Sequence, residues 1–299
     1  MNVASREEVS QHALLTSIER GTFEDVKFYT FSRRTQSGLA DKPRALFGNS
    51  VLIRKTSSYF DYVLTDGSFT EGCITDMSAP FPGERSAHID LTEYGYASDS
   101  DLEDESEGDE TAPLTMTPPL EDAEEPAKVQ RNHETATSSS KACGREGRVV
   151  FVEDIAYRTW KAFVFYAYSG KTSFAPLKSQ EQLEAPTSGQ AGRFEPPPCS
   201  PKSMYRLAEK YGIESLKEEA LEDLKGKLSP YNILTELFSS FTMLHPDVQK
   251  MEIKYLRSNI KQQTVLERLP KYFQSLEDGD LHPGAGSILA TLFVKIVTG

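Results

Sequence analysis

The chain has few cysteines, and their positions suggest neither a metal site nor a disulfide framework. Its 299 residues include three cysteines, Cys73, Cys143 and Cys199, which are odd in number and far apart. Five histidines are scattered along the chain, without an HExxH pair or a His/Cys spacing that would suit zinc. We therefore expect no metal, no cofactor and no disulfide, and a reducing cytoplasmic or nuclear location.

Long apolar runs and basic charge are also lacking. No stretch approaches the roughly 18–20 apolar residues of a membrane span, and the best candidate, residues 288–297, is short and contains Lys295. The first ten residues are polar and charged, unlike a secretion signal. With 45 acidic and 33 basic residues the formal net charge is −12, whereas a nucleic-acid binder needs a basic footprint. We expect no membrane and no direct nucleic-acid partner.

Sequence patterns of common enzymes are missing as well. The segment Gly284-Ala285-Gly286 lacks the context of a phosphate-binding loop, and neither a GxSxG motif nor a cysteine with a plausibly spaced histidine is present. Paired carboxylates are frequent only in an acidic tract that is too polar to hold them in a catalytic geometry. The sequence therefore predicts that the protein is not an enzyme.

Composition changes along the chain and predicts its organisation. Residues 1–78 and 148–228 are patterned, and a polar, acidic insert at residues 79–147 separates them. A second polar, Pro-rich insert covers residues 178–198, and residues 229–299 have the pattern of helices. Thirteen acidic and no basic residues lie between Glu93 and Glu125, so this tract carries nearly all of the net charge and the rest is close to neutral. Because so few apolar residues cannot offset chain entropy, we predict that residues 79–147 are disordered.

Hydrophobic periodicity predicts the secondary structure of the patterned parts. Leu14, Leu15 and Ile18 indicate a short helix that ends near Gly21, and Asn49 or Ser50 caps a single helix that runs to Leu64. The remaining predicted elements are strands at 25–31, 43–47 and 149–152, an aromatic helix from Asp154 to Gly170, capped helices at 201–211, 213–228 and 231–241, a helix from Pro246, a weak helix interrupted at Pro270, and a last helix at 288–297. We expect the aromatic residues Trp160, Phe163, Phe165, Tyr166 and Tyr168 to belong to the core.

This order of elements, together with four local motifs, resembles the BTB/POZ family. The motifs are FEDVKF at 23–28, LFGNSVLIRKTSSYF at 46–60, the stretch 150–170 that ends in Tyr168-Ser169-Gly170, and LAEKY at 207–211. The long acidic insert, FAPL, the Pro-rich gap and SPKSMYRLAEKYG resemble fungal members. The usual family histidine is Asn49 here, and because Asn also offers a side-chain donor to the backbone, we expect the turn to be retained.

The resemblance implies an α+β fold, in which a short sheet is flanked by helices and followed by a helical C-terminal extension. It also implies a protein–protein interaction module that forms homodimers and acts as an adaptor. The candidate dimer interface is Leu14, Leu15 and Ile18, which alternatively cover the chain's own core. Phe69-Thr70-Glu71 resembles the triplet with which BTB adaptors contact a cullin of a ubiquitin ligase; alternatively, Phe69 closes the domain and Glu71 is solvated.

Two further hypotheses concern the insert. Ser98, Ser100 and Ser106 each precede an acidic residue by three positions, and Thr117 precedes Pro118, so these are candidate phosphorylation sites, or parts of an unmodified linker. No MATH, kelch or zinc-finger segment accompanies the predicted module. A second function therefore stays open, that of a nuclear scaffold or transcriptional co-regulator whose acidic loop binds basic proteins.

Overall fold

The computed structural model describes residues 5–65, 72–90, 100–105, 145–180, 195–279, 281 and 284–297. They form a mixed α+β structure with one small sheet and many helices, as predicted at the level of fold class. The elements in chain order are α1 (Arg6–Arg20), β1 (Val26–Arg34), β2 (Leu39–Gly48), α2 (Ser50–Arg54), α3 (Ser58–Thr65), β3 (Gly72–Asp76), β4 (Ile89–Asp90), β5 (Glu103–Asp104), β6 (Glu146–Ala156), α4 (Tyr157–Ser169), α5 (Pro201–Tyr211), α6 (Glu214–Gly226), α7 (Ile233–Leu237), α8 (Ser240–Leu244), α9 (Pro246–Asn259), α10 (Gln263–Glu277) and α11 (Ala285–Val297).

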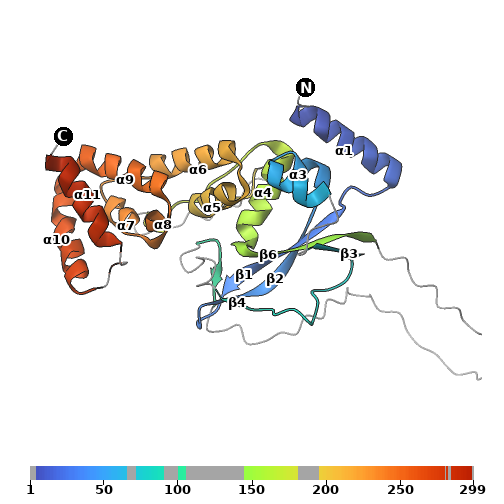
Figure 1. Cartoon of the computed structure of the whole chain (residues 1–299), viewed down its shortest axis with the longest axis horizontal. Coiled ribbons are helices and arrows are strands. Elements are labelled where there is room, and N and C mark those ends of the chain that lie inside the picture. Colours follow the sequence, from blue (N-terminus) through green and yellow to red (C-terminus); the bar gives the residue numbers. More distant parts are fainter. Residues whose placement is uncertain are drawn as a thin grey trace, which may run out of the picture.

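The sheet is built around β1 (Figure 1). Its strand order is β3-β6-β1-β2-β4, and the short β5 pairs with the end of β1. β1 pairs with β2 antiparallel and with β6 parallel, so it is central over most of its length. The first seven residues of β1 are all buried, because both faces of the sheet are covered.

Helices cover one face of the sheet. The main core joins side chains of β1 and β6 to those of α2–α6, and its centre is an aromatic cluster. Phe60 stacks on Phe163 with ring centroids 5.2 Å apart, and Tyr211 lies 4.7 Å from the Phe60 ring. Trp160 and Phe163 are fully buried. The prediction that this aromatic stripe is core is thereby confirmed for its buried members.

The other face is covered by the chain that follows β3, and here the predicted disorder of residues 79–147 is wrong for residues 79–90. Phe81 packs edge-on to Tyr29, with the ring centroids 5.1 Å apart. Lys27 donates from Nζ to the carbonyl oxygens of Met77, at 2.9 Å, and Ala79, at 2.6 Å. These few contacts hold the segment because they meet an apolar sheet face that would otherwise be exposed to water.

The C-terminal helices extend away from the sheet and have a second core of their own (Figure 1). The helix predicted at 231–241 is divided into α7 and α8, with Ser239 as the cap of α8. Pro270 lies inside α10, so the predicted interruption there is wrong. Among the described residues, no helix is both long and apolar enough to cross a membrane.

The turn before α2 is retained with Asn49, as predicted. Its Oδ1 accepts from the Leu52 backbone N–H at 3.3 Å, and its Nδ2 donates to the Phe23 carbonyl at 2.7 Å. The single helix predicted from this cap to Leu64 is instead two helices, because Ser57 caps a new helix by accepting from the Phe60 N–H at 3.3 Å.

Candidate interaction surfaces

Helix α1 carries an apolar stripe that faces solvent. The exposed fractions of Leu14, Leu15 and Ile18 are 56%, 56% and 80%. These side chains lie on one side of the helix, whereas Ala13, on the opposite side, is only 1% exposed. The alternative that Leu14, Leu15 and Ile18 cover the chain's own core is therefore wrong.

The buried side of α1 attaches the helix to the rest of the fold. Arg6 lies over the Tyr166 ring, 5.0 Å from its centroid. Val9 and His12 face α2, α3 and the turn between them across an open, shallow groove of about 500 Å³. Ser5 and Glu8 form a capping box at the start of the helix, and Gly21 ends it with a left-handed φ of 70°. The helix is thus well defined at both ends and lies at the periphery of the molecule (Figure 1), and the side chains of its apolar stripe are exposed.

The triplet predicted to contact a cullin begins four residues after α3. Phe69 and Glu71 lie outside the described residues. The last described residue before them, Thr65, ends α3. The cullin contact stays a prediction.

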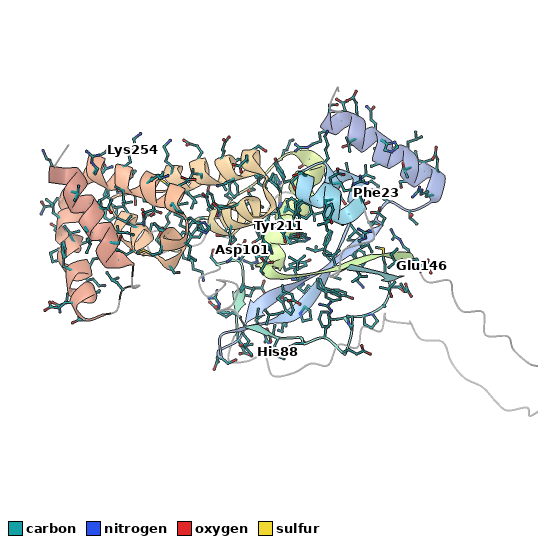
Figure 2. All side chains as sticks on the ribbon, viewed as in Figure 1. Phe23, His88, Asp101, Glu146, Tyr211 and Lys254 are labelled. Atoms are coloured by element: carbon teal, nitrogen blue, oxygen red, sulfur yellow. The ribbon has the colours of Figure 1, made fainter. Side chains whose placement is uncertain are left out.

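A second surface holds part of the acidic insert, against the prediction that this insert is disordered throughout. Asp101 is only 4% exposed, although it is one of the thirteen acidic residues of the tract from Glu93 to Glu125. Its carboxylate accepts from the Thr159 hydroxyl at 2.6 Å and from the Ser200 backbone N–H at 2.8 and 2.9 Å. In Figure 2, Asp101 lies between the sheet and the first helices of the C-terminal array.

Leu102 follows Asp101 into the fold. It is 3% exposed and packs in a small cluster with Phe31, Ala40 and Ala156, separate from the main core. It is also the only large apolar residue between Tyr96 and Leu114. This isolated leucine is the sequence signal that could have revealed the docked segment. The prediction of disorder missed it because it was based on the average composition of the tract.

Three arginines meet the acidic residues that come next. Arg158 pairs with Glu103 at 3.0 Å, Arg34 with Asp104 at 3.5 Å, and Arg33 with Glu105 at 3.6 Å. Arg33 also pairs with Asp41 of β2, its Nε donating at 2.8 Å. The main chain contributes as well, because the Glu105 N–H donates to the Arg34 carbonyl at 3.0 Å.

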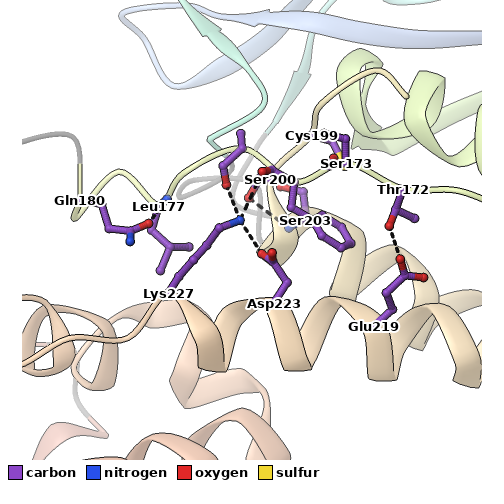
Figure 3. A network of polar contacts seen from close by, with 12 residues as sticks. Thr172, Ser173, Leu177, Gln180, Cys199, Ser200, Ser203, Glu219, Asp223 and Lys227 are labelled. Carbon is purple, nitrogen blue, oxygen red and sulfur yellow. Dashed lines mark hydrogen bonds and ion pairs between the residues drawn. The ribbon is translucent and has the colours of Figure 1, made fainter. Parts of the chain in front are cut away.

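A polar network lies around Ser200, whose backbone N–H donates to the Asp101 carboxylate (Figure 3). Residues 173–175 run beside Cys199: the Cys199 N–H donates to the Ser173 carbonyl at 3.2 Å, and the Ala175 N–H donates to the Cys199 carbonyl at 2.9 Å. Lys227, at the end of α6, donates to the Ala175 carbonyl at 2.8 Å and pairs with Asp223. The residue before the Ser200 cap of α5 is thereby held to residues 173–175, which Lys227 connects to α6.

Of the candidate phosphorylation sites, only Ser100 is described. It is half-buried and directly precedes the docked Asp101. Ser98, Ser106 and Thr117 lie outside the described residues, and their modification stays a prediction.

The C-terminal helices contain two buried carboxyl groups. Glu236 of α7 and Glu252 of α9 are 3% and 1% exposed. Thr242 places its hydroxyl 2.9 Å from Glu252 Oε2, and Lys202 of α5 forms an ion pair with Glu236. Burial raises the pKa of Glu252 to about 8, and the nearby Glu236 carboxylate adds to the rise.

A buried histidine joins the two helical regions. His245, between α8 and α9, has its Nδ1 2.7 Å from Glu209 Oε2 on α5. Burial lowers the pKa of His245, while Glu209 opposes that shift. Within the described part of the chain, no group of three or more His, Cys, Asp or Glu side chains is arranged to hold a metal.

No protein-family model matches the chain, and no curated protein matches its sequence.

Proposed function

We propose that the chain is a non-enzymatic protein-interaction module of the BTB/POZ type, which forms a homodimer through α1 and acts as an adaptor. The observation that carries the proposal is the solvent-facing stripe of Leu14, Leu15 and Ile18 on a well-capped helix. Three large apolar side chains on one face are costly to leave in water, and a second copy of the same stripe covers them symmetrically.

Two features of the fold support the type of module. Along the chain, a short helix precedes an antiparallel strand pair and a pair of helices. After β3, β4 and β5 come a strand parallel to the first, an aromatic helix and a helical hairpin. This is the order that the resemblance implies. At Asn49, where the residue differs from the family's histidine, the side chain makes two hydrogen bonds to the backbone, one as donor and one as acceptor.

Light scattering of the full chain after size-exclusion chromatography tests the dimer. We expect twice the mass of one chain for the wild type, and the mass of a single chain for the double variant Leu14→Glu and Ile18→Glu. Leu244→Glu is the matched control, because Leu244 is 63% exposed but lies on α8. A wild-type mass that corresponds to one chain at all concentrations would refute dimerisation.

The adaptor role extends to the predicted cullin contact. Phe69→Ala combined with Glu71→Lys should abolish a cullin pull-down, while Leu244→Glu should leave it unchanged. Undiminished cullin recovery with the double variant would show that this triplet is not the contact. The dimer test does not depend on this result, since the two surfaces are formed by different parts of the chain.

A further inference from the structure

We propose that the site that holds residues 100–105 is a recognition site for acidic peptides, and that this segment is a tethered ligand that occupies it. The site takes peptides in which an aspartate and a leucine are followed by acidic residues. A partner protein with such a segment binds by displacing the chain's own copy.

Asp101 supplies the most selective contact. Its carboxylate accepts from two buried donors, the Thr159 hydroxyl and the Ser200 N–H, whose residues are 0% and 4% exposed. An asparagine would turn an N–H₂ group toward one of these donors, and an alanine would leave both without an acceptor. The site therefore distinguishes a carboxylate from its nearest neutral analogue.

Leu102 provides an apolar anchor next to that carboxylate. Phe31, Ala40 and Ala156 surround it, and the two alanines leave the space that a branched side chain fills. None of these residues belongs to the main core cluster. The segment is thus held in its own small pocket and is not needed to complete the aromatic centre of the fold.

The backbone of the segment extends the sheet. β6 pairs with β1 as far as Phe31 and Ala156, where α4 begins. β5 takes the place that β6 has left, and it pairs parallel with Arg33 and Arg34 at the end of β1. Addition of a short strand to a sheet edge, with side chains in flanking pockets, is a common way in which proteins bind extended peptides.

Three arginines explain why the site would prefer acidic residues after the leucine. Arg158, Arg34 and Arg33 each pair with one of the three consecutive acids. Glu105 also accepts from the Gln36 backbone N–H at 3.1 Å. Every residue from Asp101 to Glu105 therefore has a specific contact, which is more than a solvated linker would make.

The covalent connections allow the segment to leave the site. Nine residues lie between Asp90 and Ser100, and thirty-nine lie between Glu105 and Arg145. An extended residue spans about 3.3–3.6 Å, so the shorter connection, from Asp90 to Ser100, reaches at most about 36 Å and keeps a released segment close to the site. A ligand tethered in this way has an effective concentration of about millimolar, and a free peptide must compete with it.

Peptide binding to the full chain tests the proposal. The probe is a fluorescein-labelled peptide of the sequence SDSDLEDESE, measured by fluorescence anisotropy. The released chain carries Asp101→Ala and Leu102→Ala. We expect it to bind the probe at least tenfold more tightly than the wild type, whose site is occupied. A probe with Asn in place of the aspartate before leucine should bind the released chain at least tenfold more weakly.

A pair of charge variants locates the site. Added to the released chain, Arg158→Glu should weaken probe binding several-fold, whereas Lys225→Glu should leave it unchanged. The two side chains are matched, since each is 54% exposed and each pairs with a glutamate. Equal effects of both variants would mean that the peptide responds to overall charge only, and this would overturn the proposal.

Hydrogen exchange of the unmodified chain provides the second measurement. Amides of residues 101–105 should exchange at least tenfold faster than those of β1 and β6, because the segment leaves while the sheet stays intact. Equal protection, or global unfolding of the released chain, would identify β5 as a permanent part of the sheet. Failure of the released chain to bind the probe would overturn the proposal independently, and neither result concerns the dimer at α1.

Discussion

Replacement of Glu252 by glutamine should change how the stability of the chain depends on pH. Glu252 is 1% exposed and lies near Glu236, which is 3% exposed. Burial and the Glu236 carboxylate raise the pKa of Glu252 from 4.5 to about 8. At neutral pH the native protein therefore holds a proton on this carboxyl group, and the unfolded chain does not.

The sign and the size of the effect follow from this difference in bound protons. The stabilising contribution of the protonated form is complete below pH 4.5 and is lost as the pH rises to 8. Within this window the free energy of unfolding falls by up to about 1.4 kcal/mol per pH unit, and over the whole window by at most about 5 kcal/mol. Glutamine binds no proton in either state, so Glu252→Gln should lack this slope.

Urea unfolding of the full chain at pH 5, 6, 7 and 8, followed by circular dichroism, measures the slopes. The wild type should lose stability relative to Glu252→Gln at each step, since the contributions of distant groups cancel in the difference. Glu218→Gln is the control: Glu218 is exposed on α6, and this variant should follow the wild type. Parallel curves for the wild type and Glu252→Gln would refute the reasoning, as would a carboxyl carbon resonance of Glu252 that titrates near pH 4.5.

Three substitutions test local packing by thermal and urea unfolding. Gly147→Ala should destabilise the chain by about 1–3 kcal/mol, because its new Cβ would lie 1.9 Å from the Met77 sulfur. Gly226→Ala is the control and should be neutral or slightly stabilising, because no atom lies within 4 Å of its new Cβ. An equal loss of stability in both variants would contradict the predicted clash. Asn49→Ala removes the cap of α2 and should cost about 1–2 kcal/mol, with Asn49→Asp in between because it keeps the acceptor; no loss would show that the cap is dispensable. Tyr168→Phe removes the hydroxyl that accepts from the Asn49 N–H at 2.6 Å and should cost about 1–3 kcal/mol, while an unchanged stability would mean that water replaces the hydroxyl.

Local sequence patterns predicted the strands and helices that have a regular apolar pattern or a capping signal of their own. β1 was recognisable because residues 25–31 have the composition of a strand and a near-alternating pattern. That its first seven residues are all buried could be seen only in the structure. The Ser200 cap with Pro201 at the first helical position predicted the start of α5 correctly. The break between α2 and α3 was missed because the apolar periodicity continues across it. The side chain of Ser57 nevertheless caps a new helix there.

The docked part of the insert was beyond such reasoning for a different reason. Composition describes an average over the tract, and the average of residues 79–147 is that of a chain that cannot fold alone. The contacts of Asp101 and Leu102 come from residues far away in sequence, such as Phe31, Ala156 and Ser200. The buried contacts of one aspartate and one leucine, together with three ion pairs, hold the segment against a pocket that the rest of the fold has built.

These contacts also change how the net charge of −12 is to be understood. The acidic tract carries nearly all of the excess, but three of its acids, Glu103, Asp104 and Glu105, pair with arginines of the near-neutral remainder. Release of the segment would therefore do two things at once: it would add free acidic chain and uncover a basic site on the sheet edge. An acidic partner meets repulsion from the tract until it reaches that site, where the same charge is attracted. Salt screens the repulsion and the attraction alike, so the comparison of two variants is the test: the loss of probe affinity caused by Arg158→Glu in the released chain should become smaller at higher salt.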